Sequence, residues 1–253
     1  MKKILCFGDS NTWGFVPGSG QRYPENIRWP GALAEILGPE YVIIEDGISG
    51  RTTVWDDPFA PYRNGLEGLG YGLLRAKPID LVVLMLGTND LYHTNAFGYY
   101  RGLSRVTRRI LGAQEYYHDS SPVFEKEPKV LLVSPITLHP DIGKLRPELN
   151  LHYEESCQFA VYTKQLAEEL SVQWVDAAAW AKASEVDGLH LTPEGHLTWA
   201  VFLQIQSKQC SELQENNMAK IHRADVDVVG AGSGGLAAAI SAAWHGDVLL
   251  VER

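Results

Sequence analysis

The 253-residue chain carries 31 acidic and 22 basic side chains, which gives a net charge of -9, and 45% of its residues are hydrophobic. These values are typical of a globular chain with one main domain and room for a second small piece. Binding to a phosphate backbone depends on clustered Lys and Arg, and no such run occurs, so we expect no nucleic-acid partner. Cys6, Cys157 and Cys210 are far apart, which favours a reducing, cytoplasmic compartment over a disulfide framework.

The sequence predicts neither a signal peptide nor a membrane span. The apolar run behind Lys2 and Lys3 covers only residues 4–7, far short of the roughly 7–15 residues of a signal-peptide core. No stretch of about 18 apolar residues occurs.

Compact apolar runs alternate along the chain with longer helical patterns. The predicted strands cover residues 3–7, 41–44, 79–86, 129–133 and 172–175, and the predicted helices cover residues 28–37, 66–75, 97–111, 153–170 and 193–213. Residues 46–65 and 134–150 are rich in Gly, Pro and Asp and are expected to be long loops. Because the run IDLVVLMLG is apolar almost throughout, we expect a parallel sheet covered on both faces, in a flavodoxin-like three-layer α/β/α domain.

Short polar motifs follow the predicted strands. GDSN follows the first strand, DGISG the second and GTND the third, and DGLHLTPEGH follows the last strand across a short connection and starts the last helix. In a parallel sheet the carboxyl ends of the strands share one edge, so we expect these motifs to meet there. Asp187 and His190 are three residues apart, a spacing that lets both side chains enter the same crevice.

These residues match the needs of nucleophilic acyl transfer. A serine hydroxyl needs a base within hydrogen-bond reach, and a third group must orient that base. Ser10, His190 and Asp187 supply these three roles. The oxygen that becomes negative in the tetrahedral intermediate needs N–H donors, which the Gly50 backbone, the Asn89 amide and the Ser10 backbone can supply.

The blocks Gly8-Asp9-Ser10-Asn11, Gly50, Gly87-Thr88-Asn89-Asp90 and Asp187-x-x-His190 resemble those of the SGNH, or GDSL-type, hydrolases over residues 1 to about 213. CFGDSNTWG, GISGRTTVWDDP and MLGTND are similar to the arylesterase/acyltransferase branch, which acts on short-chain esters and passes acyl groups to alcohols. The resemblance implies Ser10 as nucleophile, Asp187 and His190 as its partners, Gly50 and Asn89 in the oxyanion hole, a small ester substrate, no metal or organic cofactor, and a possible homo-oligomer. We interpret Asn11, where the motif has leucine, as a neutral change.

Each residue also has a structural interpretation. Ser10 could be a helix N-cap, and Asn89 could only close a turn, as we expect of Asp90. The segment after Asp187 could be a simple turn into a helix capped at Thr192. His196, six residues past His190, is expected to pack or face solvent rather than catalyse.

Two other classes of function remain open. A metal hydrolase would use some of the histidines, but their spacings match no metal motif such as His-Glu-x-x-His, and full activity in EDTA would exclude it. A binding module built on an inactive hydrolase would be expected to lack a member of the Ser-His-Asp set, and all three are present.

After a linker over residues 214–224, residues 225–253 form a separate pattern of strand, glycine turn, Ala-rich helix and strand, with strands expected at residues 226–229 and 248–251. Gly230, Gly232, Gly235 and Glu252 fit a dinucleotide-binding fingerprint that resembles the start of FAD-dependent oxidoreductases of the fumarate-reductase type. Because such a unit lacks the other strands of a flavin site, we favour a truncated βαβ fragment that binds no cofactor. The alternative is the hydrolase half of a fused flavoprotein oxidoreductase.

Overall fold

The computed structural model describes residues 1–117, 121–212, 226–229 and 248–251, and the side chains of the last long helix as far as residue 204. The chain divides into two compact units, Met1–Ser211 and Glu212–Arg253. We describe each unit by itself.

The first unit is built on a parallel sheet of five strands in the order β2-β1-β3-β4-β5. This order is the flavodoxin-like one, and it confirms the predicted parallel sheet. Each strand lies within a few residues of its predicted range: β1 (Lys2–Gly8), β2 (Tyr41–Gly47), β3 (Leu81–Met85), β4 (Val130–Ser134) and β5 (Gln173–Asp176).

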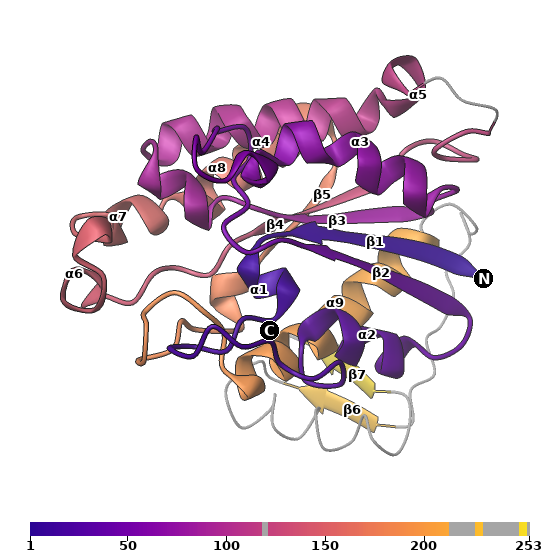
Figure 1. Cartoon of the computed structure of the whole chain (residues 1–253). Helices are drawn as coiled ribbons and strands as arrows, with labels where there is room; N and C mark the ends of the chain where they lie inside the picture. Colours follow the sequence, from indigo (N-terminus) through magenta and orange to yellow (C-terminus); the bar gives the residue numbers. More distant parts are fainter. Residues whose placement is uncertain (118–120, 213–225, 230–247, 252–253) are drawn as a thin grey trace. The chain divides into compact units, whose positions relative to one another are not determined.

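Helices cover both faces of the sheet (Figure 1). One face carries α3 (Gly65–Ala76), α4 (Ala96–Leu111) and α8 (Phe159–Leu170), and the other carries α1 (Ser10–Trp13), α2 (Trp29–Leu37) and α9 (Pro193–Glu212). The three-layer α/β/α arrangement is therefore confirmed.

Each strand contributes side chains to two separate cores. In β1, Leu5 and Phe7 pack into the core under α3, α4 and α8, whereas Ile4 and Cys6 pack into the core that contains Trp29 of α2. Because successive side chains of a strand point to opposite faces, a strand that is covered on both sides must be apolar at every position. This is the reason for the continuous apolar runs of the sequence.

Some predicted boundaries were wrong. The predicted helix over residues 153–170 is two helices, α7 (Tyr153–Ser156) and α8, because the Ser156 hydroxyl donates to the Tyr153 carbonyl at 2.6 Å and accepts the Leu138 N–H at 3.0 Å. A side chain that bonds the backbone in this way competes with helix continuation. The other short helices were not predicted: α5 (Ala113–Tyr116), α6 (Ile142–Leu145), η1 (Pro61–Arg63), η2 (Thr88–Tyr92), η3 (Pro147–Leu149) and η4 (Ala177–Ala179).

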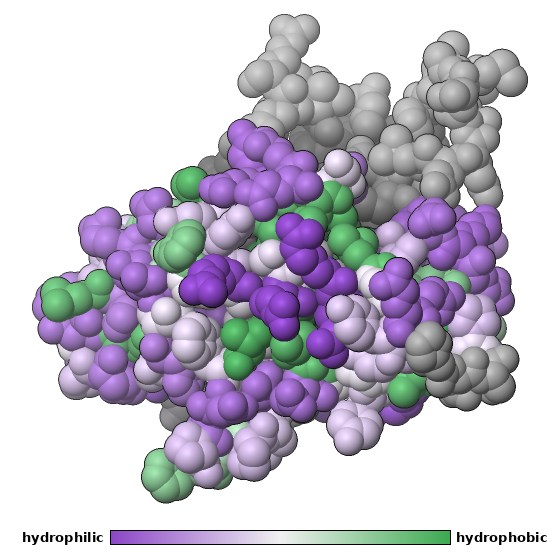
Figure 2. All heavy atoms as spheres, turned by 90° about the horizontal axis from the view of Figure 1, so that it is seen from above, coloured by the Kyte–Doolittle hydropathy of each residue, from purple (hydrophilic) through white to green (hydrophobic). Residues whose placement is uncertain are grey.

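The face that carries α3, α4 and α8 is mostly hydrophilic, with scattered apolar side chains (Figure 2). Among the exposed apolar residues of these helices are Tyr71, Phe97 and Val161. Scattered exposure of this kind is ordinary for a protein surface. Within the described part of the chain, no helix is long and apolar enough to cross a membrane.

In the second unit, β6 (Val226–Val229) and β7 (Val248–Val251) form a parallel pair, as the sequence predicts. The fingerprint residues Gly230, Gly232, Gly235 and Glu252 lie outside the described residues.

Candidate active site

Three loops meet at the carboxyl edge of the sheet, because β1 pairs in parallel with both β2 and β3. Gly8 at the end of β1 lies opposite Gly47 of β2 and Met85 of β3. The loops that leave these three strand ends carry Ser10, Gly50 and Asn89. The structure thus brings to one edge the three motifs that the sequence predicts to meet.

The turn after β1 places Ser10 at the first position of the short helix α1. Asp9, not Ser10, is the N-cap of this helix, and its carboxylate accepts the Asn11 N–H at 2.9 Å. The Ser10 hydroxyl is therefore not used for capping. Its Oγ lies 2.9 Å from Nε2 of His190, and the side chain is buried except for a small exposed fraction of 5%.

His190 is held on its other side by Asp187. Its Nδ1 lies 2.7 Å from Asp187 Oδ2, and Asp187 Oδ1 accepts the N–H groups of Leu189 and His190 at 3.1 Å. Burial acts to raise the pKa of Asp187, but the hydrogen bond and charge of His190 outweigh it and lower that pKa to about 2. The carboxylate can only accept, so Nδ1 carries the hydrogen and Nε2 is left as an acceptor for the Ser10 hydroxyl.

Two further side chains contact this pair. The ring of Phe15 stacks on the His190 ring, with a centroid separation of 4.2 Å and an interplanar angle of 22°. Arg146 donates from Nε to the Asp187 carbonyl at 3.3 Å. Both contacts restrict the segment that carries the base.

Asn89 lies between the turn that carries Ser10 and the loop after β2. Its Nδ2 donates to the Arg51 carbonyl at 3.1 Å and lies 3.5 Å from Asp9 Oδ2. Burial raises the pKa of Asp9 to about 6, although the hydrogen bond from the Asn11 N–H and the charges of His190 and Arg51 lower it. The Asn89 amide is thus held by one neighbour on each side, Asp9 and Arg51.

Gly50 has a left-handed backbone with φ of 82°, and a Cβ at this position would lie 2.4 Å from Nε of Arg63. Only glycine fits such a position. Within the described part of the chain, neither the Gly50 N–H nor the Ser10 N–H donates to a protein acceptor. Two backbone donors are therefore available at this edge, whereas the Asn89 amide already donates to Arg51 and Asp9.

Buried charges hold the loop that carries Gly50. The Arg51 guanidinium, 2% exposed, donates to Asp46 Oδ1 at 2.8 Å and to the Gly8 carbonyl at 3.1 Å. We expected Asp90 only to close its own turn. Instead, its carboxylate accepts both the N–H and the hydroxyl of Thr53 on the loop after β2. Burial raises the pKa of Asp90 to about 7 against the effect of these hydrogen bonds.

His196 is fully buried in α9 and does not reach Ser10. Its Nδ1 accepts the Trp29 N–H at 3.3 Å, and its ring meets that of Tyr23 edge-on at a centroid distance of 5.3 Å. Burial and the charge of His190 lower the pKa of His196 to about 3, so the ring is neutral. Thr192 accepts the Gly195 N–H at 3.2 Å, as expected of the cap of α9.

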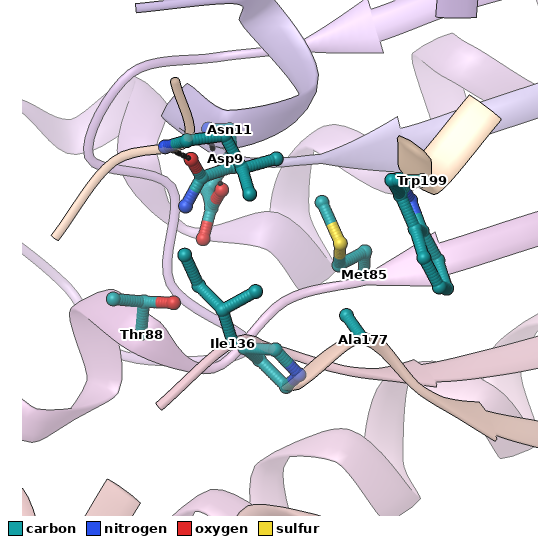
Figure 3. A pocket seen from close by; sticks show the side chains of 9 residues that line it. Asp9, Asn11, Met85, Thr88, Ile136, Ala177 and Trp199 are labelled. Carbon is teal, nitrogen blue, oxygen red and sulfur yellow. Dashed lines mark hydrogen bonds between the residues drawn. The ribbon is translucent and has the colours of Figure 1, made fainter. Parts of the chain in front are cut away.

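A small pocket of ≈ 10 Å³ lies beside the turn that carries Ser10, with room for about one water molecule. Figure 3 shows Asp9, Asn11 and Thr88 on one side of it and Met85, Ile136, Ala177 and Trp199 on the other. One wall is polar and the opposite wall is apolar. The residues that line the pocket include neither Ser10 nor His190, and a cavity of this size has no room for an acyl group.

The described part of the chain holds no group of three His, Cys, Asp or Glu side chains that could bind a metal ion.

The model of the GDSL-like Lipase/Acylhydrolase family matches residues 6–197. The chain belongs to this family. This GDSL-like acylhydrolase is a carboxylic ester hydrolase, which agrees with the Ser10, His190 and Asp187 geometry.

Solved structures support the assignment. An aryl esterase of M. smegmatis is 33% identical and covers 83% of this chain and 100% of its own, with a TM-score of 0.75. A carbohydrate acetylesterase from Sinorhizobium meliloti is also 33% identical, covers 82% and 99%, and has a TM-score of 0.75. A putative arylesterase from Agrobacterium tumefaciens is 32% identical, covers 83% and 100%, and has a TM-score of 0.72. Among curated proteins, no relative matches this chain.

The family match ends at residue 197, before the segment with the glycine fingerprint. None of the comparisons supports the resemblance of that segment to an FAD-dependent oxidoreductase.

Sequence reasoning missed several residues of this site. Asp9 could have been found, because an Asp at the start of a helix is a strong N-cap signal. Asn11, which we interpreted as a neutral change, has two buried partners: its Nδ2 donates to the Leu189 carbonyl at 3.3 Å and its Oδ1 accepts the Leu191 N–H at 2.9 Å. The partners of Asn11 and Asp90 lie on other loops, and Arg51 bonds residues at the ends of β1 and β2, so no local motif indicates these contacts.

The pKa of His196 leads to a stability prediction for His196→Gln. The unfolded histidine takes up a proton near pH 6.5 and the folded one only near pH 3, so between these values the unfolded chain binds more protons. The wild type should therefore lose stability relative to His196→Gln by about 1.4 kcal/mol for each pH unit below 6.5. Urea unfolding of both proteins at pH 7, 6 and 5 measures this difference.

Asp9 and Asp90 titrate in the same range with the opposite sign, because their raised pKa values favour the folded state at low pH. Both carboxyl groups are present in the wild type and in His196→Gln, so their effect cancels in the difference between the two unfolding free energies. A difference in unfolding free energy that does not change with pH would contradict the neutral, buried state of His196.

Proposed function

We propose that this protein is a serine esterase that hydrolyses small carboxylic esters, with aryl or short-chain acyl groups, through an acyl-enzyme on Ser10. The observation that carries the proposal is the continuous path from Asp187 Oδ2 to His190 Nδ1 at 2.7 Å and from His190 Nε2 to Ser10 Oγ at 2.9 Å. A nucleophile, a base and an orienting carboxylate within hydrogen-bond reach are the requirements of this chemistry.

In the first half of the reaction, Ser10 Oγ attacks the ester carbonyl carbon while His190 Nε2 takes the hydroxyl proton. The ionised Asp187 stabilises the imidazolium that forms. Collapse of the tetrahedral intermediate breaks the bond to the alcohol, which leaves with the proton from His190. The acyl group is then bound to Ser10 Oγ.

In the second half, His190 takes a proton from a water molecule, which attacks the acyl carbon. The bond from that carbon to Ser10 Oγ then breaks, His190 returns the proton to Oγ, and the acid is released. An alcohol in place of water would yield a new ester, and we propose this acyl transfer as a side activity. The negative oxygen of both intermediates would be stabilised by the Ser10 and Gly50 N–H groups and the Asn89 amide. The similarity to an aryl esterase and to a carbohydrate acetylesterase supports a preference for aryl and short-chain acyl esters.

Ser10→Ala should abolish the hydrolysis of p-nitrophenyl acetate without unfolding the protein. The variant removes the nucleophile, and a triad fails as a unit when an essential member is lost. Initial rates with p-nitrophenyl acetate measure the loss of activity in Ser10→Ala. For the wild type, a series of p-nitrophenyl esters of increasing acyl length measures the acyl preference, and added alcohol tests acyl transfer. Wild-type rates in Ser10→Ala would end the proposal.

The two histidines provide a matched pair for the base. His190→Gln should be inactive, because only His190 contacts Ser10 and Asp187. His196→Gln should keep most of the wild-type kcat when it is assayed at a temperature where it is folded. The opposite ranking of the two variants would reassign the base.

Asn89→Ala should lower kcat about 10²–10³-fold and change KM much less. The reason is that an oxyanion donor acts mainly on the charge of the transition state. Steady-state kinetics on p-nitrophenyl acetate separates the two constants. A change confined to KM would make Asn89 a substrate-binding residue instead.

We also propose that the second unit takes no part in hydrolysis, so that removal of residues 222–253 leaves kcat/KM within about a factor of two. The matches to the aryl esterase and acetylesterase structures span 99–100% of those chains but only 82–83% of this one. Because those esterases are matched almost in full, this supports the proposal that the hydrolase does not need the tail. We expect no flavin in the purified full-length protein, which its absorbance spectrum would reveal. Stoichiometric FAD, or loss of activity on truncation, would contradict this proposal.

A further inference from the structure

Asn11 connects two parts of the active site that are far apart in the sequence. It follows Ser10 directly, and its side chain is 4% exposed. Its amide donates to the carbonyl of Leu189 and accepts the N–H of Leu191, at 3.3 Å and 2.9 Å. These two residues flank His190, so one side chain holds the backbone on both sides of the base.

We propose that Asn11 is a positioning residue that sets the distance between Ser10 Oγ and His190 Nε2. The inference rests on the proposed roles of Ser10 and His190. Asn11 adjoins Ser10, and its amide bonds both neighbours of His190. The turn that carries Ser10 (residues 9–14) and the segment that carries His190 (the base segment, residues 184–191) therefore move together. A displacement of about 1 Å of a catalytic group can cost 10²-fold in rate, so a restraint at this point matters for turnover.

The other contacts of the base segment do not replace this restraint. The bond between Asp187 and His190 lies within the segment, and so do the bonds from Gly188 N–H to Ser184 and from Ser184 N–H to the His190 carbonyl. The Gly188 carbonyl accepts the His139 N–H and the Asp187 carbonyl accepts from Arg146 Nε, and both bonds tie the segment to a different loop. Phe15 stacks on the ring, but a stacking contact permits sliding.

An amide side chain is suited to make both bonds. The Leu189 carbonyl needs a donor and the Leu191 N–H needs an acceptor, and asparagine offers one of each on a short side chain. The leucine of the family motif has neither, although it has nearly the same size. Leu189 and Leu191 are 4% and 2% exposed, so their polar groups would be left buried and unpaired.

The test compares Asn11→Leu, Asn11→Ala and Asn95→Ala. Asn95 is the N-cap of α4 and accepts the Gly98 N–H at 3.0 Å, so its variant also loses an asparagine bond to the backbone, but away from Ser10. We expect kcat for p-nitrophenyl acetate to fall about 10–100-fold in both Asn11 variants, with KM changed less than about 3-fold. Asn95→Ala should keep the wild-type kcat, and thermal unfolding shows whether the variants are folded.

Two readouts separate positioning from general destabilisation. The low-field proton resonance of His190 Nδ1–H should persist in Asn11→Leu, because Asp187 and His190 share one segment. The rate at which a fluorophosphonate modifies Ser10 should fall in parallel with kcat. Loss of the resonance together with a kcat that recovers on cooling would indicate a merely structural role and overturn the proposal.

One result depends neither on the folding of the variants nor on the esterase assignment. In the wild type, the Leu191 amide should exchange its hydrogen slowly, and exchange at the rate of an exposed amide would overturn the bond to Asn11. If Ser10→Ala is inactive while Asn11→Leu has the wild-type kcat, only the positioning role fails. If Ser10→Ala is fully active, the proposed function itself fails.

Discussion

The parallel pairing of β1 with both of its neighbours is the constraint on which the site depends. The pairing puts Gly8, Gly47 and Met85 at the same level of the sheet, so the three following loops start from nearly the same place. Ser10 follows two residues after Gly8, and the other two loops need only three or four residues to bring Gly50 and Asn89 to the same edge. A one-residue slip of any pair would also turn every apolar side chain of that strand to the other face.

Buried polar groups hold the loops in place, because loops lack the regular backbone hydrogen bonds that join the strands. Arg51 bonds the Gly8 carbonyl and the Asp46 carboxylate, so the loop after β2 is held against the end of β1. A buried ion pair adds little net stability, but it leaves few alternative arrangements, because either charge without its partner would be costly. The bonds from Thr53 to Asp90 act in the same way between the loops after β2 and β3.

The sheet, its layers and the residues that come together at its edge could be predicted because they depend on local patterns. Apolar runs indicate strands, and a small polar motif after each run indicates a shared edge. The partners that hold the site could not be predicted in this way. Asn11 was interpreted as neutral because its partners lie 178 and 180 residues away, and the break in the helix at Ser156 depends on a bond to Leu138 on another loop.

The two histidines near the end of the first unit show what decides between catalysis and packing. His190 and His196 are six residues apart and both are buried, so neither burial nor residue type distinguishes them. His190 has a carboxylate at one ring nitrogen and a hydroxyl at the other, and it can therefore accept a proton and keep the resulting charge stabilised. His196 faces a backbone N–H at one nitrogen and, within the described residues, no acceptor at the other, so protonation would place an unpaired charge in the core. The partners of a buried histidine, and not its burial, determine whether it can act as a base.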